Sequence, residues 1–245
     1  MYGQLCAEFY DADKKFAPTE EIAFYRNIFN KTDLILEPMC CSGRLLIPLL
    51  REGYQIHGVD NSSAMIKSCE VRAERFNITP ILFTSTIENL SLPYKYDGII
   101  IPLGSFQLFY PRTIAFKVLE VFHQHLKPKG KLVFDLFVPW ESLYEHGEEE
   151  LTESEVKINE HEIIKNKSHN IVNKKEQFIL SSNQYTKIIN GKTMAKEQEQ
   201  MHLCWYYRYE MELILEKYSF PNIIYQERML NNYNHMSFIA EKGLA

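Results

Sequence analysis

Short apolar runs separated by amphipathic stretches fill the chain from Leu34 to Phe137. The runs are Leu34–Leu36, Ile56–Val59, Ile81–Phe83, Gly98–Leu103 and Lys131–Phe137. They lack the polar alternation of a half-exposed strand, so they predict a buried parallel sheet with helices on both faces. The stretches between them, residues 43–51, 62–76 and 111–126, predict the crossover helices, and residues 20–29 predict one more helix before the first strand.

The pattern changes after Pro139, where charged stretches alternate with apolar residues at a period of two. Val156 and Ile158 follow this alternation, and so do the residues from Tyr185 to Ile189. Asn190-Gly191 then separates two such runs, and this dipeptide favours a two-residue hairpin turn. We therefore predict an antiparallel β segment, and we interpret the acidic run of residues 148–150 before it as a solvated linker.

The last part of the chain returns to the first pattern. Apolar residues from Met211 to Tyr218 lie on one face of a predicted helix that begins at Arg208, and residues 223–228 and 235–241 predict two final strands. We therefore predict an α/β fold with two parts. Residues 1–149 and 208–245 form a Rossmann-like domain, and residues 150–207 form an antiparallel β insertion.

Composition and charge narrow the class of protein. The 245 residues are 45% hydrophobic and 24% charged, which excludes a disordered chain or a coiled coil. With 27 Lys and Arg against 32 Asp and Glu, and a pI near 5.9, a small-molecule partner is favoured over nucleic acid. No apolar run reaches roughly 18 residues and no leader follows Met1, so we expect a cytoplasmic protein without a membrane span. Five cysteines without a C-x-x-C pair predict reduced thiols and no metal site.

Two acidic residues stand at the ends of the first two predicted strands. Glu37 ends the first strand and is followed by small residues up to Gly43, and Asp60 ends the second strand. The turn after the first strand brings backbone N–H groups to a ligand, and an acid at the second strand end can accept two ribose hydroxyl hydrogen bonds. This pair predicts a nucleoside-containing cofactor. The G-x-G-x-x-G spacing of dinucleotide sites is absent, which disfavours an NAD-binding oxidoreductase.

These residues resemble the class I S-adenosylmethionine (SAM) dependent methyltransferases, whose first motif reads acid-x-G-x-G-x-G. Glu37, Gly43 and Asp60 match that pattern, while Met39 and Cys41 stand where the family commonly has glycine. If either position needs a positive φ, its side chain makes the backbone strained. Residues 126–134 and 212–222 are similar to the family's fifth strand and to its last helix with the approach to the sixth strand.

The resemblance implies the cofactor, the fold and the binding residues. It implies SAM as cofactor and a seven-stranded, mostly parallel sheet with the insertion as a lid. Glu37 would bind the ammonium end of the methionine, Asp60 the ribose, and the segment at Thr86 the adenine. The full set of expected cofactor-binding residues is Glu37, Met39, Cys40, Gly43, Asp60, Asn61, Met65, Thr86, Ile87 and Leu103.

Two residues are candidates for positioning the acceptor. Gln107 follows the fourth strand, where open α/β sheets bind ligands. Tyr10 lies in Glu8-Phe9-Tyr10-Asp11, which is similar to an N-terminal segment of the amino-sugar N-methyltransferases. Those enzymes carry a histidine near the position of Gln107, and an amide cannot act as a base. His202 and the aromatic run at residues 205–209 could line an acceptor pocket or simply pack in the core.

The predicted function is an enzyme, a SAM-dependent methyltransferase that transfers a methyl group to N or O of a small-molecule acceptor by in-line displacement. Two alternatives stay open. One is a SAM-binding regulatory module with impaired catalysis, and the other is a methyltransferase acting on RNA or protein. We expect a monomer or a homodimer.

Overall fold

The computed structural model describes residues 3–144, 149–230 and 233–243, and its chain divides into two compact units. One unit comprises Phe16–Val138 and Trp205–Ala245, and the other comprises Met1–Lys15 and Pro139–Cys204. The sequence pattern placed the first 15 residues in the Rossmann-like domain. In the structure, residues 3–15 group with the insertion instead, because the helix formed by residues 4–13 packs on the insertion's strands.

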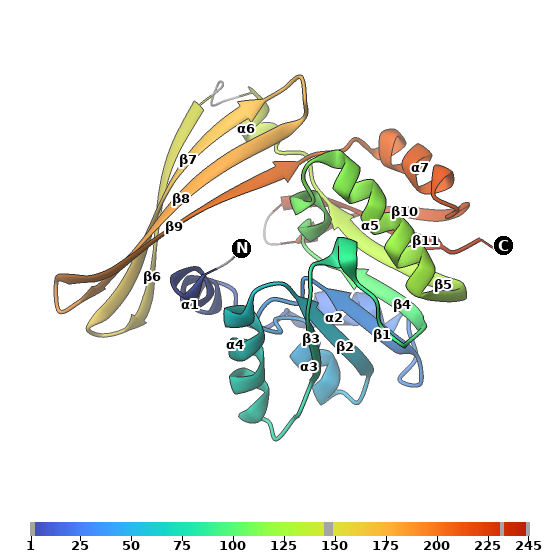
Figure 1. Cartoon of the computed structure of the whole chain (residues 1–245), viewed down its shortest axis with the longest axis horizontal. Coiled ribbons are helices and arrows are strands. Elements are labelled where there is room, and N and C mark those ends of the chain that lie inside the picture. Colours follow the sequence, from blue (N-terminus) through green and yellow to red (C-terminus); the bar gives the residue numbers. More distant parts are fainter. Residues whose placement is uncertain (1–2, 145–148, 231–232, 244–245) are drawn as a thin grey trace. The chain divides into compact units, whose positions relative to one another are not determined.

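The first unit is built on a seven-stranded sheet with the strand order β10-β11-β5-β4-β1-β2-β3. The strands are β1 (Leu34–Pro38), β2 (Gln55–Asp60), β3 (Ile81–Thr84), β4 (Tyr96–Ile101), β5 (Leu126–Leu136), β10 (Asn222–Leu230) and β11 (Tyr233–Glu241). Strands β1 to β5 pair in parallel, and β11 is antiparallel to both β5 and β10. This confirms the predicted, mostly parallel sheet (Figure 1).

Helices cover both faces of this sheet (Figure 1). One layer contains α2 (Thr19–Arg26), α3 (Leu46–Arg51) and α4 (Ser63–Glu74), whose apolar residues pack with Ile35, Ile100 and Val133 of the strands. The opposite layer contains α5 (Arg112–His125) and α7 (Arg208–Lys217), where Phe116 of α5 stacks on Tyr218, the residue after α7. The inner strands β1, β2, β4 and β5 are therefore buried on both sides, which explains why they contain continuous apolar runs.

Two element boundaries differ from the sequence prediction for the same reason. The helix predicted from Gly43 begins at Leu46, and the strand predicted to reach Leu103 ends at Ile101. Gly43 has φ 80°, and Leu103 and Gly104 have φ 53° and 75°. Left-handed residues fit neither a helix nor a strand, so both elements stop where a loop is needed at the sheet edge.

The second unit is a four-stranded antiparallel sheet with a helix packed on it. Its strands are β6 (Glu149–Asn159), β7 (Glu162–Asn173), β8 (Phe178–Ile189) and β9 (Lys192–Cys204), in that order. Asn190 and Gly191 join β8 to β9 with φ 49° and 75°, which confirms the predicted two-residue hairpin turn. Of the acidic run, residue 148 lies outside the described residues, and Glu149 and Glu150 begin β6, so the linker interpretation was wrong for these two.

The helix of this unit, α1 (Gln4–Asp13), is held by charged groups of the sheet. The backbone N–H groups of Leu5 and Cys6 donate to the Glu197 carboxylate at 3.0 and 3.1 Å. An anion at a helix N-terminus satisfies its unpaired donors and interacts favourably with the helix dipole. Lys187 of β8 forms ion pairs with Glu8 of α1 at 2.8 Å and with Glu162 of β7 at 2.6 Å. The sequence analysis predicted no helix at this position. A short α6 (Trp140–Tyr144) also belongs to this unit.

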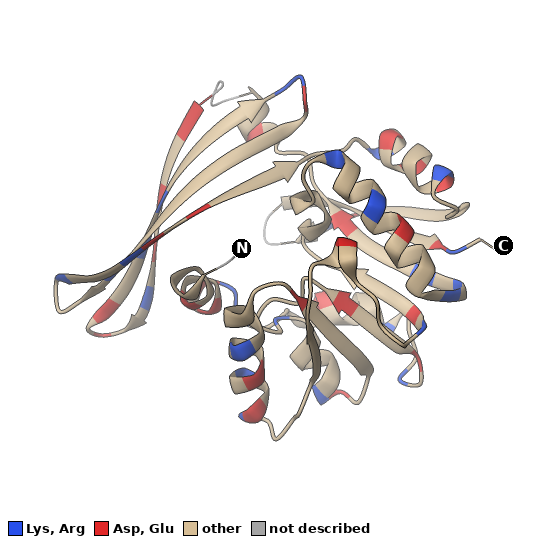
Figure 2. Ribbon diagram, viewed as in Figure 1, with Lys and Arg blue, Asp and Glu red and all other residues tan. Residues whose placement is uncertain are grey.

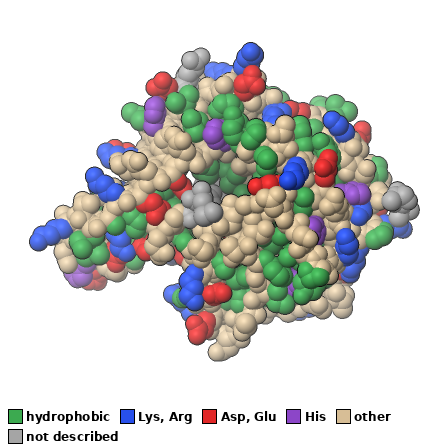
Figure 3. Space-filling view, viewed as in Figure 1, with side chains coloured by type: hydrophobic (Ala, Val, Ile, Leu, Met, Phe, Trp, Pro, Cys, Tyr) green, Lys and Arg blue, Asp and Glu red, His purple; other side chains and the backbone are tan. Residues whose placement is uncertain are grey.

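Charges of both signs are mixed along the helices. Helices α4 and α5 each carry basic and acidic side chains (Figure 2), and the face in Figure 3 shows blue and red side chains interspersed. None of the described helices is long and apolar enough to cross a membrane.

Candidate cofactor and active site

The loop after β1 contains three alternate residues in the left-handed conformation. Met39, Cys41 and Gly43 have φ values of 57°, 49° and 80°. These are the three positions at which the resembled motif has glycine, so the condition for strain at Met39 and Cys41 is met. A left-handed non-glycine residue costs roughly 1–2 kcal/mol. At position 43, glycine is also required by the available space, because a Cβ atom there would lie 2.6 Å from the Cys69 Sγ atom.

Asp60 at the end of β2 fixes this loop. Its Oδ2 accepts a hydrogen bond from the Cys41 N–H at 3.0 Å, and its Oδ1 accepts one from the Ser62 N–H at 2.9 Å. The Asp60 side chain is buried, which raises its pKa, while the backbone donors of Ser62 and Cys41 act in the opposite direction. Ser62 in turn accepts from the Met65 N–H at 3.3 Å as the N-cap of α4. The loop, the strand end and the helix start therefore form one connected unit.

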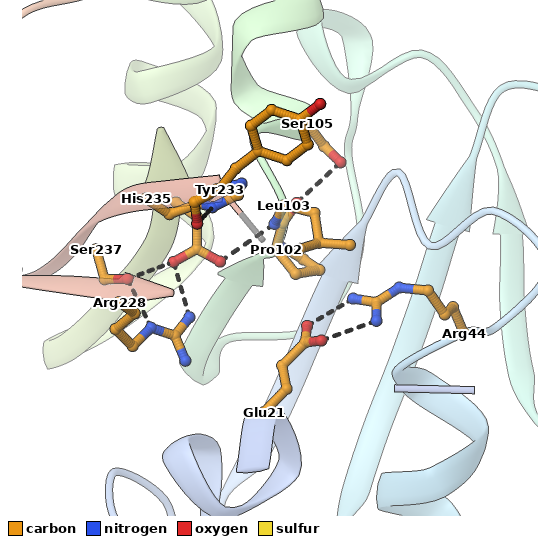
Figure 4. Close-up of polar contacts among 10 residues, drawn as sticks. Glu21, Arg44, Pro102, Leu103, Ser105, Arg228, Tyr233, His235 and Ser237 are labelled. Atoms are coloured by element: carbon orange, nitrogen blue, oxygen red, sulfur yellow. Dashed lines mark hydrogen bonds and ion pairs between the residues drawn. The ribbon is translucent and has the colours of Figure 1, made fainter. Parts of the chain in front are cut away.

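Glu37 at the end of β1 is a buried acid with an unused oxygen. It is 2% exposed, one carboxylate oxygen accepts from the Leu46 N–H, and Oε2 has no hydrogen-bond partner among the described residues. The guanidinium of Arg44, which interacts electrostatically with Glu37, makes a bidentate pair with Glu21 of α2 at 2.8 and 2.5 Å (Figure 4). Burial raises the pKa of Glu37 to about 8, although Arg44 partly lowers it. A cationic ligand group would supply the missing partner.

The remaining predicted cofactor residues lie at the same edge of the sheet. Asp60 pairs in register with Thr84, and the Ser85 N–H donates to the Asp60 carbonyl at 3.1 Å, which joins the ends of β2 and β3. Thr86 and Ile87 follow directly, with Ile87 inside the 3₁₀ helix η1 (Ile87–Asn89). Cys40, Met65 and Ile87 are buried, and Asn61 is exposed.

The loop after β4 is held tightly against the end of β5. Gly104 is left-handed, and a Cβ there would lie 2.7 Å from the Phe137 ring. The Gln107 amide is fully buried, donates to the Phe137 carbonyl at 2.9 Å and accepts from the Phe137 N–H at 2.8 Å. Gln107 therefore joins this loop to β5, and its expected role toward the acceptor stays a prediction.

The structure places Tyr10 on α1, in the other compact unit from the cofactor residues. Its expected role over the site also stays a prediction. In that unit, Glu199 of β9 accepts from the Tyr185 hydroxyl at 3.2 Å and from the Cys6 thiol at 3.4 Å, and burial raises the pKa of Glu199.

A groove of about 650 Å³ crosses the four strands of this unit. One row of its lining, Thr152, Ser168, Asn183 and Glu199, is aligned across the strands by register. The lining is rich in hydroxyl and amide groups, so it suits a polar ligand.

Sequence reasoning missed a buried charge on β5. Asp135 is fully buried, and Arg228 of β10 donates to it at 2.8 Å. The only signal was a single acid within the apolar run at residues 131–137 and a basic residue in a later predicted strand. No group of three or more His, Cys, Asp or Glu within residues 3–144, 149–230 and 233–243 is arranged to hold a metal ion.

Known proteins similar to this chain are methyltransferases. Residues 35–130 match the family model described as a methyltransferase domain. A curated protein from Geobacillus sp., named as a methyltransferase, is 26% identical over 102 residues, which are 42% of this chain and 41% of that protein. The matched region thus spans less than half the length of that relative.

Several solved structures resemble the whole chain. A S-adenosylmethionine-dependent methyltransferase from Clostridium acetobutylicum is 17% identical with a TM-score of 0.76, over 97% of this chain and 98% of that chain. An amino pentose methyltransferase from Micromonospora echinaspora, solved with SAM bound, is 14% identical with a TM-score of 0.72, over 99% and 98%. A sugar N-methyltransferase from a Streptoalloteichus species is 15% identical with a TM-score of 0.73, over 100% and 96%.

The fold of the chain is the Rossmann-like fold of solved SAM-dependent methyltransferases, as the sequence predicted. Within this fold, residues 35–130 are the part that matches a methyltransferase domain. The predicted cofactor, SAM, is the molecule bound in the similar amino pentose methyltransferase.

Proposed function

We propose that this protein transfers the methyl group of SAM to a nitrogen or oxygen atom of a small-molecule acceptor. The observation that carries the proposal is the pair of buried acids on adjacent strands, Glu37 with an unused oxygen and Asp60 holding the loop between them. An acid that lacks a cation fits the ammonium group of a methionine moiety. An acid at the next strand end fits a ribose.

The loop backbone also supports SAM over a dinucleotide. All three alternate positions of the motif are left-handed, although two of them are not glycine. The motif therefore keeps its backbone conformation although Met39 and Cys41 replace glycine. This favours an active enzyme over a SAM-binding regulatory module with impaired catalysis. A pyrophosphate would require the closer backbone approach of a G-x-G-x-x-G turn, which the chain lacks.

When bound, SAM supplies an electrophilic methyl group on a positively charged sulfur atom. The residues of this chain then have to hold the cofactor, orient the acceptor in line and exclude water. An amine acceptor attacks with its own lone pair and needs no strong base, whereas a hydroxyl acceptor benefits from one. Gln107 cannot accept a proton at neutral pH, so an amine is the simpler acceptor for a site built on this residue.

The antiparallel unit supplies groups for the acceptor in this proposal. The aligned row of Thr152, Ser168, Asn183 and Glu199 offers hydroxyl, amide and carboxylate groups, which suit a hydroxylated amine. Two of the similar solved structures are named as methyltransferases of an amino pentose and of a sugar nitrogen, and they match this chain over both of its units. We therefore favour a small amine over RNA or protein as acceptor.

The test has two stages. Isothermal titration should show micromolar binding of SAM and of its demethylated product, S-adenosylhomocysteine, and none of NADH. Turnover is then measured as S-adenosylhomocysteine release with pooled amines, amino sugars and polyols. Binding of NADH in place of SAM would overturn the proposal. SAM binding with turnover only on RNA or protein would overturn the small-molecule acceptor.

Glu199→Gln and Asn183→Ala test the acceptor groups. Both should raise the KM for the acceptor at least tenfold and leave the SAM affinity unchanged. Lys165→Met, which changes an exposed ion pair of the same sheet, is the matched control. An unchanged acceptor KM in both variants would contradict the role of the row.

A further inference from the structure

Asp135 connects three separate parts of the first unit. Its carboxylate accepts hydrogen bonds from Arg228 of β10 at 2.8 Å, from the Ser237 hydroxyl of β11 at 2.6 Å and from the backbone N–H of Leu103 at 3.1 Å (Figure 4). The side chain is fully buried, and Arg228 is nearly so. Arg228 also donates to Ser237 at 2.7 Å and lies over the Phe24 ring of α2 at 3.5 Å.

The pair itself is weak evidence for stability. Removing two charges from water costs about as much as their attraction returns, and apolar replacements are often neutral. The buried ion pair between β5 and β10 is therefore better explained by the backbone segments that Asp135 holds in place. Two of the three donors come from the terminal hairpin, but the third comes from the loop after β4, at the edge where open α/β sheets bind ligands.

That loop has an unusual backbone which depends on such a contact. Leu103 and Gly104 are both left-handed, and Leu103 is a branched residue without the freedom of glycine. The Leu103 N–H points to Asp135, the Ser105 hydroxyl donates to the Pro102 carbonyl at 3.0 Å, and Gln107 bonds to Phe137. Figure 4 shows Pro102, Leu103 and Ser105 of this loop with these hydrogen bonds as dashed lines. The loop is thus anchored on β5 at both ends.

We propose that Asp135 is a positioning residue for the cofactor site, which acts by holding the backbone of Leu103 and Gly104 in its left-handed shape, while Arg228 and Ser237 hold Asp135. This inference rests on the proposed function, because it assigns Leu103 to the cofactor. The carboxylate does not contact the cofactor itself. Its effect on binding is transmitted through the backbone of the loop.

The test compares Asp135→Asn with Tyr96→Phe. The control removes the buried hydrogen bond of 3.1 Å between the Tyr96 hydroxyl and His57 Nδ1, at the opposite end of β4 from the loop. S-adenosylhomocysteine is the probe, and isothermal titration gives its affinity. Asp135→Asn should bind it at least tenfold more weakly than the wild type, and Tyr96→Phe should remain within twofold.

Hydrogen exchange without any ligand is a second readout. In Asp135→Asn, amides of residues 103–107 should exchange at least tenfold faster, with no change in the loop at residues 39–43. If Asp135→Asn does not fold, Ser237→Ala removes one of the three hydrogen bonds without removing the charge and should weaken binding about threefold. Wild-type affinity with unchanged exchange in a folded Asp135→Asn protein would overturn the inference. Failure of the wild type to bind the probe would instead overturn the proposed function.

Discussion

The backbone N–H of Cys41 donates a hydrogen bond of 3.0 Å to the carboxylate of Asp60, which joins the loop after β1 to the end of β2. The acid that is expected to bind the cofactor ribose is therefore the same group that holds the cofactor loop in place. Its second oxygen accepts from Ser62 at the start of α4. Binding and loop geometry depend on one buried side chain.

Replacing Asp60 with asparagine should therefore weaken SAM binding strongly. The amide offers one acceptor oxygen in place of two, so either Cys41 or Ser62 loses its partner. Hydrogen bonds to charged groups contribute about 1.5–3 kcal/mol, so we expect a loss of roughly 10- to 100-fold in SAM affinity by isothermal titration. Asp97→Asn is the control, because Asp97 also accepts a backbone N–H, that of Leu34 at 2.8 Å, at the start of β1. Equal losses in the two variants would contradict the special role of Asp60.

Cys41→Gly and Gly43→Ala should differ clearly in their effects on stability. Glycine at position 41 relieves the left-handed strain but adds freedom to the unfolded chain, so the free energy of unfolding should stay within about 1 kcal/mol of the wild type. Alanine at position 43 is left-handed and its Cβ meets Cys69 and Ile47 below 3 Å, so it should cost roughly 2 kcal/mol or more. Urea unfolding measures both. A Gly43→Ala protein as stable as Cys41→Gly would disprove the assigned geometry.

Glu37 makes the stability of the cofactor-free protein depend on pH. Burial raises its pKa from 4.5 to about 8, so between these values the folded chain binds more protons than the unfolded chain. The stability that the neutral acid provides is complete below about pH 4.5 and is lost as the pH rises through 8. Glu37→Gln removes this dependence. In urea unfolding, the free energy of unfolding of Glu37→Gln minus that of the wild type should increase by on the order of a few kcal/mol from pH 5 to pH 8.5.

The control for this prediction is the carboxylate of Glu52, a half-buried acid whose pKa is lowered by its ion pair with Arg26. Glu52→Gln should show no growing advantage between the same pH values. A constant difference between the wild type and Glu37→Gln across this range would mean that Glu37 does not titrate there.

Lys187→Met should loosen α1 and leave the seven-stranded sheet unchanged. Lys187 pairs with both Glu8 and Glu162, and these two hydrogen bonds raise its pKa. Without the ammonium group, both acids lose the cation that joins them and keep the amide donors of Gln4 and Asn159. Hydrogen exchange of residues 4–13 should rise several-fold. Lys167→Met, which changes an exposed pair with Glu153, should leave these amides as in the wild type. Unchanged exchange of α1 in Lys187→Met would show that the apolar contacts alone hold the helix.

Local patterns in the sequence were sufficient to predict the architecture and to place Glu37 and Asp60 at one edge of the sheet. The continuous apolar runs predicted β1 to β5, and the strand-end acids Glu37 and Asp60 lie side by side because parallel strands end at one edge. The resemblance of the loop to a glycine-rich motif raised the question of strain at Met39 and Cys41. Only the structure showed that both residues have positive φ, because these angles depend on how the loop closes onto Asp60.

Other features depend on which strands become neighbours. Asp135 meets Arg228 and Ser237, which follow it by 93 and 102 positions, only because β11 pairs with β5 in one particular register. Likewise, α1 packs on strands that lie more than 140 residues later. Periodicity records only which face of an element avoids water, so the sequence determined the elements and the edge that they form. The partners of the buried charges were decided by the tertiary structure, because a charge removed from water is compensated only by groups that the folded strands bring within hydrogen-bond distance.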